Sequence, residues 1–141
     1  MSRPLALRLA LGYLAISGLF VGVWAAVAPH SFFSDFPGLG HMWTASDGRY
    51  NEHLVRDVGD LNLALVVVTV AAAVWSSRAL VIAAAAAWIV YSVPHLAYHA
   101  LNLDAVSSGD RAAEIVALAV PIVVAGVVLV LSARSDPAAS G

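Results

Sequence analysis

Histidine and carboxylate side chains recur at a four-residue spacing in two parts of this 141-residue chain. His53 and Asp57 form one pair, and His95 and His99 form the other. Residues four apart lie on one face of an α-helix, so each pair could reach a common metal ion, as the two histidines of an H-E-x-x-H helix do. Together the pairs predict a site of three imidazoles and one carboxylate for Zn(II), Fe(II) or another divalent ion.

Further polar side chains flank the two pairs and could orient the imidazoles or form ion pairs beside them. Those near in sequence are Glu52, Arg56, Asp60 and Tyr91, and Glu114 lies farther along the chain. A carboxylate that accepts a hydrogen bond from a ligating imidazole fixes the tautomer of that ring. Haem is a variant of the same prediction, with His53 and either His95 or His99 as its axial ligands.

The same residues also fit interpretations without a cofactor. An ion pair of Arg56 with Asp57 or Asp60 can be kept for conformational specificity alone. His95 and His99 can lie at the headgroup level of a membrane, where amphipathic rings are favoured. A proton or substrate path is the third interpretation, and Tyr91 can equally be a packing residue.

The composition decides which kind of protein must position these side chains. Hydrophobic residues make up 61% of the chain and charged residues 11%, against roughly 45–50% and 25% in soluble domains. A net charge of −2 excludes a basic nucleic-acid-binding protein, and the absence of cysteine excludes disulfides and thiolate metal sites. We therefore expect a small multi-pass protein of the bacterial inner membrane, with the lipid bilayer as its surroundings and no nucleic acid as a partner.

Four apolar stretches approach the roughly 20 residues that a membrane helix needs. We expect an all-α, up-and-down four-helix transmembrane bundle in a single domain, 1–134, with helices at 5–28, 54–75, 79–99 and 111–131. The tail 135–141 is predicted to be disordered. The first stretch also resembles a secretory signal, since Ala26 and Ala28 form an A-x-A site, but it is longer than a usual signal and is taken as a helix. Gly18 and Gly22 in it permit close helix contact.

The connections set the expected geometry. Ser76, Ser77 and Arg78 leave room only for a tight turn, which makes the second and third helices antiparallel neighbours. Residues 29–51 form the one long loop, and its aromatic side chains predict that it lies in the membrane interface over the end of the bundle. Ser107 to Asp110 are typical of a helix N-cap.

The distribution of charges predicts the orientation. Arginines divide four to three between the two ends of the bundle, which favours cytoplasmic N- and C-termini. All the histidines then lie at the non-cytoplasmic end. At 100° per residue, His53, Asp57 and Asp60 form one stripe, and Asn62 points the opposite way. We expect this stripe to face the bundle interior and to meet the histidines of the third helix.

The layout resembles the DoxX-like group of small four-helix bacterial membrane proteins. The resemblance depends on the size, the four spans, the long first outer loop and the polar stretch Glu52-His53-Leu54-Val55-Arg56-Asp57-Val58-Gly59. It implies a redox accessory role, because some members are associated with quinone-linked oxidoreductases; no catalytic residue is transferred from it.

Two functions follow as hypotheses from these patterns. In the first, an inner-membrane protein binds a divalent metal or haem at its outer-side histidine and aspartate cluster and acts in redox or small-molecule chemistry. In the second, a non-catalytic accessory or assembly subunit uses the polar cluster only to order its bundle, beside a membrane partner protein or a second copy of itself. Whether the protein is an enzyme is left open.

Overall fold

Four long helices make up most of the computed structural model, which describes residues 3–46, 48–102 and 107–133. They are α1 (Arg3–Val27), α4 (Glu52–Trp75), α5 (Arg78–Leu101) and α6 (Ser108–Ala133). All four are long and apolar enough to cross a membrane. The described part of the chain is otherwise two short helices and one short hairpin. This all-α architecture is compatible with a multi-pass integral membrane protein.

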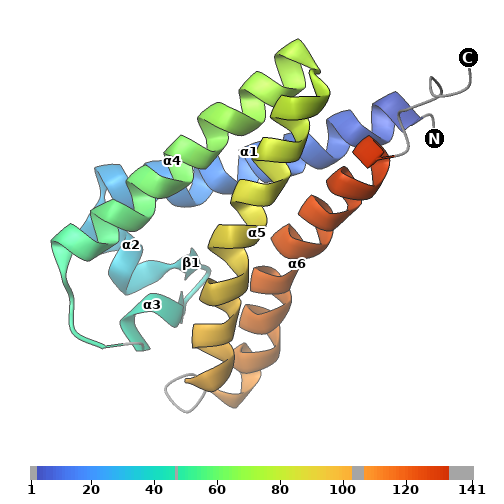
Figure 1. Ribbon diagram of the computed structural model, residues 1–141. Helices are drawn as coiled ribbons and strands as arrows, with labels where there is room; N and C mark the ends of the chain where they lie inside the picture. The colour runs from blue at the N-terminus through green and yellow to red at the C-terminus, as the bar shows by residue number, and fades with distance from the viewer. Residues whose placement is uncertain (1–2, 47, 103–106, 134–141) are drawn as a thin grey trace, which may run out of the picture.

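The long helices pack as two pairs, α1 with α4 and α5 with α6. The pairs are joined where α4 meets α5, at a turn in which Ser76 adopts a left-handed conformation with φ 51°. The Ser77 hydroxyl then accepts a hydrogen bond from the Leu80 N–H at 3.2 Å and caps the start of α5. From this turn the two helices diverge, so the starting end of α4 and the finishing end of α5 lie well apart (Figure 1).

Small residues bring α1 and α4 together. A Cβ atom added to Gly59 would lie 2.5 Å from the backbone nitrogen of Ala26, and one added to Gly22 would lie 3.1 Å from the Gly59 carbonyl oxygen. The backbones can therefore approach only because these positions lack a side chain. Arg56 strengthens the same contact, because its guanidinium donates to the Ala26 carbonyl in the last turn of α1.

The core between the pairs is mostly apolar and contains the hydrogen-bonded side chains of Trp88 and Thr69. The Trp88 indole N–H donates to the Thr69 hydroxyl at 2.9 Å, and that hydroxyl donates to the Leu65 carbonyl at 2.7 Å. Small and branched side chains fill the space around them: Leu11, Leu14, Ala72, Val81, Ala84, Ala85, Ala125 and Val128. Every polar group of this pair is thus satisfied inside the bundle.

Residues 29–51, predicted as a loop, contain helices and a hairpin over most of the part that the structure describes, while their place in the membrane interface stays a prediction. They form α2 (Pro29–Asp35), β1 (Pro37–Gly38), β2 (His41–Met42) and α3 (Trp43–Ser46). The strands pair antiparallel, and Leu39 and Gly40 between them have positive φ angles of 58° and 86°, as a two-residue type I′ turn requires. We call α2, the hairpin and α3 the cap, because they lie in the angle between the two helix pairs (Figure 1).

The aromatic side chains of the cap pack inward. Phe32 is buried, and its ring lies 4.6 Å from that of Phe36 and 5.9 Å from that of Trp24 on α1, measured between centroids. Rings that pack on one another at these distances remove more apolar surface from water than rings spread along an interface would. This mutual packing is the physical reason why the segment folds over the bundle.

Candidate functional site

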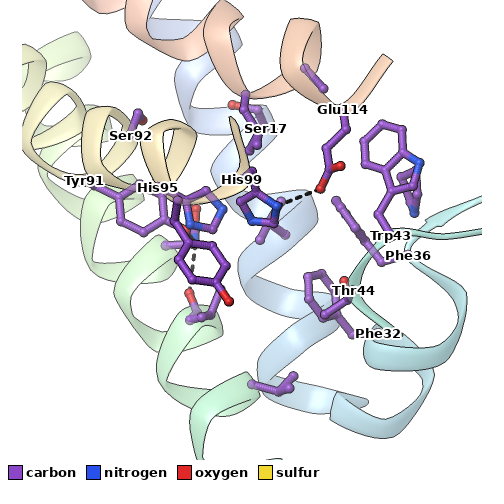
Figure 2. Close-up of a pocket in the computed structure, with 18 of the residues that line it drawn as sticks. Ser17, Phe32, Phe36, Trp43, Thr44, Tyr91, Ser92, His95, His99 and Glu114 are labelled. Carbon is purple, nitrogen blue, oxygen red and sulfur yellow. Dashed lines mark hydrogen bonds and ion pairs between the residues drawn. The ribbon is translucent and has the colours of Figure 1, made fainter. Parts of the chain in front are cut away.

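A cavity of about 730 Å³ lies beneath the cap, where the two helix pairs diverge. Most of its wall is apolar, with aromatic side chains from the cap, α1 and α5: Phe20, Phe32, Phe33, Phe36, Trp43, Trp88, Tyr91 and Tyr98. Figure 2 shows labelled members of the wall from the cap, α1, α5 and α6 converging on one space. An apolar cavity of this size with a few polar groups is the usual form of a small-molecule site.

Three polar side chains of the cavity, Tyr91, His95 and His99, lie at successive turns of α5. The ring of His95 stacks on Tyr91, with centroids 5.4 Å apart and planes 17° apart. It meets His99 edge to face at 4.8 Å. The sequence prediction that His95 and His99 share one face is therefore confirmed by the geometry of α5, and that face lines the cavity (Figure 2).

Glu114 of α6 reaches His99 across the helix pair. Its Oε1 lies 2.8 Å from Nδ1 of His99, and the two side chains are 3% and 13% exposed (Figure 2). A buried carboxylate beside an imidazole forms a charge-assisted hydrogen bond that holds the ring in one orientation. The sequence analysis named Glu114 only as one of several polar side chains that could orient an imidazole or form an ion pair beside it.

Asn62 supplies the polar contact from α4. It is 2% exposed, and its amide nitrogen donates to the Tyr91 hydroxyl at 3.0 Å and to the Val58 carbonyl at 2.8 Å. The prediction that Asn62 points away from the stripe of His53 and Asp57 is confirmed, but the assignment of the two faces was wrong. The face that carries Asn62 is the interior one.

His53, Asp57 and Asp60 lie on the exposed face of α4, which corrects the expectation that they face inward. The side chains of His53 and Asp57 are 88% and 56% exposed, they lie 3.5 Å from each other, and neither lines the cavity. The reason is the contact at Gly59, which turns the small-residue face of α4 toward α1 and thereby turns the acidic stripe outward.

The predicted four-ligand cluster of His53, Asp57, His95 and His99 is therefore not assembled. In residues 3–46, 48–102 and 107–133, no group of three or more histidine, aspartate or glutamate side chains could hold a metal ion. The divergence of α4 from α5 separates the two pairs, whereas the tight turn alone suggested that they stay side by side. A haem held between His53 and a histidine of α5 would also require these two diverging helix ends to lie side by side.

The remaining charged residues at this end serve the fold. Arg56 pairs with Glu52 at 2.9 Å rather than with Asp57 or Asp60. His41 lies 2.5 Å from Asp110 and so ties the hairpin of the cap to the start of α6. The hydroxyl of Ser107 accepts from the Asp110 N–H at 3.3 Å, which confirms the predicted N-cap of α6.

Comparison of the chain with known protein families, curated proteins and solved structures finds no match. The resemblance to the DoxX-like group stays a prediction from the layout of the sequence. The site must be interpreted from its own chemistry.

Proposed function

We propose that this protein is an integral membrane protein that binds a lipophilic small molecule in the cavity beneath its cap. The observation that carries the proposal is the cavity itself, about 730 Å³ and lined mostly by apolar and aromatic side chains, with Tyr91, His95, His99 and Glu114 among its polar lining residues. Such a wall suits a ligand with an apolar, ring-containing body and one polar end. The arginine bias predicts that this end of the bundle is the non-cytoplasmic one, in the inner membrane.

The burial of the polar wall supports binding rather than a solvent-exposed polar surface. His99 and Glu114 are held almost out of solvent, and Asn62 is buried behind Tyr91. Polar groups are costly to bury unless they are satisfied, so their concentration beside an apolar space favours a site that receives a polar group. A redox role for such a ligand, as predicted from the sequence, remains a hypothesis.

Two alternatives come from the sequence. A divalent metal or haem would have to use His95 and His99 without His53 and Asp57, so it has fewer protein ligands than predicted. An accessory or assembly subunit is favoured by the mutual pairing of buried polar groups, His99 with Glu114 and Asn62 with Tyr91, since such pairs order a bundle without any ligand.

Filling the cavity separates these possibilities. Ala117 of α6 lines the cavity, whereas its neighbour Val116 is 61% exposed and does not. We expect 2-ethylnaphthalene, a planar apolar probe, to raise the melting temperature of the purified wild-type protein and of Val116→Phe but not of Ala117→Phe. Organic extracts of the wild type should also contain a lipophilic compound that extracts of Ala117→Phe lack.

The outcomes are distinct. If the probe stabilises neither the wild type nor the control, and the extracts of wild type and Ala117→Phe are alike, the cavity is not a binding site and the accessory role stands. Stoichiometric metal in elemental analysis of the wild type, or a haem absorption band, would replace the proposal by the metal or haem alternative.

A further inference from the structure

The hydroxyl hydrogen of Tyr91 determines what kind of polar end the cavity accepts. We propose that the ligand is an uncharged compound whose polar end is a hydrogen-bond acceptor, such as a ketone oxygen, received by the Tyr91 O–H. This inference rests on the proposed function, because it specifies the ligand of the same cavity.

The orientation of the Asn62 amide follows from its surroundings. The Val58 carbonyl, 2.8 Å away, can only accept, so the atom of Asn62 that faces it must be the nitrogen. The same nitrogen lies 3.0 Å from the Tyr91 oxygen. Because an amide nitrogen donates and does not accept, the Tyr91 oxygen is the acceptor in this bond and its own hydrogen is directed elsewhere.

That hydrogen has no acceptor among the residues that the structure describes. The neighbouring His95 stacks on the Tyr91 ring, and stacking brings no acceptor into line with the hydroxyl. The Thr69 hydroxyl, by contrast, makes both kinds of hydrogen bond: it accepts from the Trp88 indole N–H and donates to the Leu65 carbonyl. Tyr91 is thus a donor that lines the cavity with one hydrogen bond still to make (Figure 2).

The charges of the wall favour an uncharged ligand. His99 and Glu114 are paired with each other at 2.8 Å, and Arg49, which also lines the cavity, is exposed to solvent. An ionic ligand end would lose its hydration in an apolar cavity whose charged groups on α5 and α6 already bind one another. A carbonyl loses far less on transfer and regains a hydrogen bond from Tyr91.

A matched set of probes tests this inference. 2-Acetylnaphthalene carries an acceptor oxygen, 2-ethylnaphthalene has nearly the same shape without it, and 2-naphthoate is the anionic counterpart. We expect the wild-type protein in detergent to bind the ketone about tenfold more tightly than the hydrocarbon, as one net hydrogen bond provides, and the carboxylate more weakly than the ketone. Dissociation constants from calorimetry, corrected for partition into the micelles, give these ratios.

Two variants locate the effect. Tyr91→Phe removes the donor but keeps the ring, so the preference for the ketone should fall to about twofold or less. Tyr50→Phe removes the hydroxyl of a residue that packs against His30 and does not line the cavity, so it should keep the tenfold preference.

Failure of this inference differs from failure of the proposed function. Equal binding of ketone and hydrocarbon by the wild type overturns the acceptor assignment but leaves a hydrophobic binding site. A preference that survives in Tyr91→Phe overturns the role of Tyr91, and tightest binding of the carboxylate overturns the uncharged class. Absence of binding by every probe overturns both proposals, and none of the wild-type comparisons depends on a variant folding.

Discussion

Replacing Gly59 by alanine tests the helix contact on which the whole arrangement depends. The new Cβ would lie 2.5 Å from the Ala26 nitrogen and 3.0 Å from two further backbone atoms of α1. Backbone atoms cannot rotate away as a side chain can, so α1 and α4 must separate by about 1 Å and lose part of their mutual packing.

The size of the effect follows from two opposed terms. Overpacking a close contact costs about 1–3 kcal/mol, whereas glycine to alanine in a helix gains about 1 kcal/mol of intrinsic propensity. Gly12→Ala in α1 isolates the second term, because a Cβ there would meet no atom within 4 Å. The difference between the two variants should therefore be about 1–3 kcal/mol, with Gly59→Ala the less stable.

The assay is thermal unfolding of both variants in the same detergent, followed by circular dichroism. At roughly 2–4 °C for each kcal/mol, Gly59→Ala should melt about 2–12 °C below Gly12→Ala. Gly18→Ala should lie between them, because its added Cβ would meet the side chains of Val66 and Trp88 rather than backbone. Equal melting temperatures for Gly59→Ala and Gly12→Ala would show that α1 and α4 do not meet at this point.

Three further predictions concern the polar residues at the same end. The side chains of His53 and Asp57 are 88% and 56% exposed, so their replacement by alanine should change neither probe binding nor stability by more than about 0.5 kcal/mol. Calorimetry measures the binding and melting curves measure the stability. A loss of binding would show that these residues belong to the binding site. Glu114→Gln removes the charge beside buried His99 and should lower the stability by about 1–3 kcal/mol. The melting temperature measures this loss, and an unchanged melting temperature would mean that His99 and Glu114 do not pair. Asn51→Ala removes the side-chain oxygen that accepts from the Leu54 N–H at 3.2 Å and should lower the stability by about 1 kcal/mol, whereas Asn51→Gly should lower it by only a few tenths. Equal losses of stability in the two variants would contradict the role of Asn51 as the N-cap of α4.

The helices themselves could be predicted from the sequence because their signals are local. The long apolar runs predict four spans by length alone, and the structure has four helices of that kind. Ser107 was recognised as a cap by its own chemistry and by Asp110 three residues later, and both contacts are present. Signals of this sort depend on neighbours in the chain, so they do not require knowledge of the packing.

The orientation of α4 could not be obtained in the same way. Helical periodicity placed His53 and Asp57 on one face and Asn62 on the opposite face, which the structure bears out. Periodicity does not say which face is inside, and charged residues in the first turns of a membrane helix can remain in the headgroup region. The deciding signal was Gly59, because two helices approach each other most closely where the facing residues of both helices are small.

The same contact explains why the site lies where it does. Because α4 is held against α1 at Gly59, its starting end cannot also follow α5, and the space between the pairs widens into a cavity that the aromatic cap covers. The cap in turn is tied to α6 by His41 and Asp110 at 2.5 Å. Asn62, three residues and so almost one full turn beyond Gly59, is thereby turned toward Tyr91, and its amide nitrogen donates to the Tyr91 oxygen. A glycine contact between α1 and α4 thus sets the donor direction of a hydroxyl on α5, which links the packing of the bundle to the chemistry of its cavity.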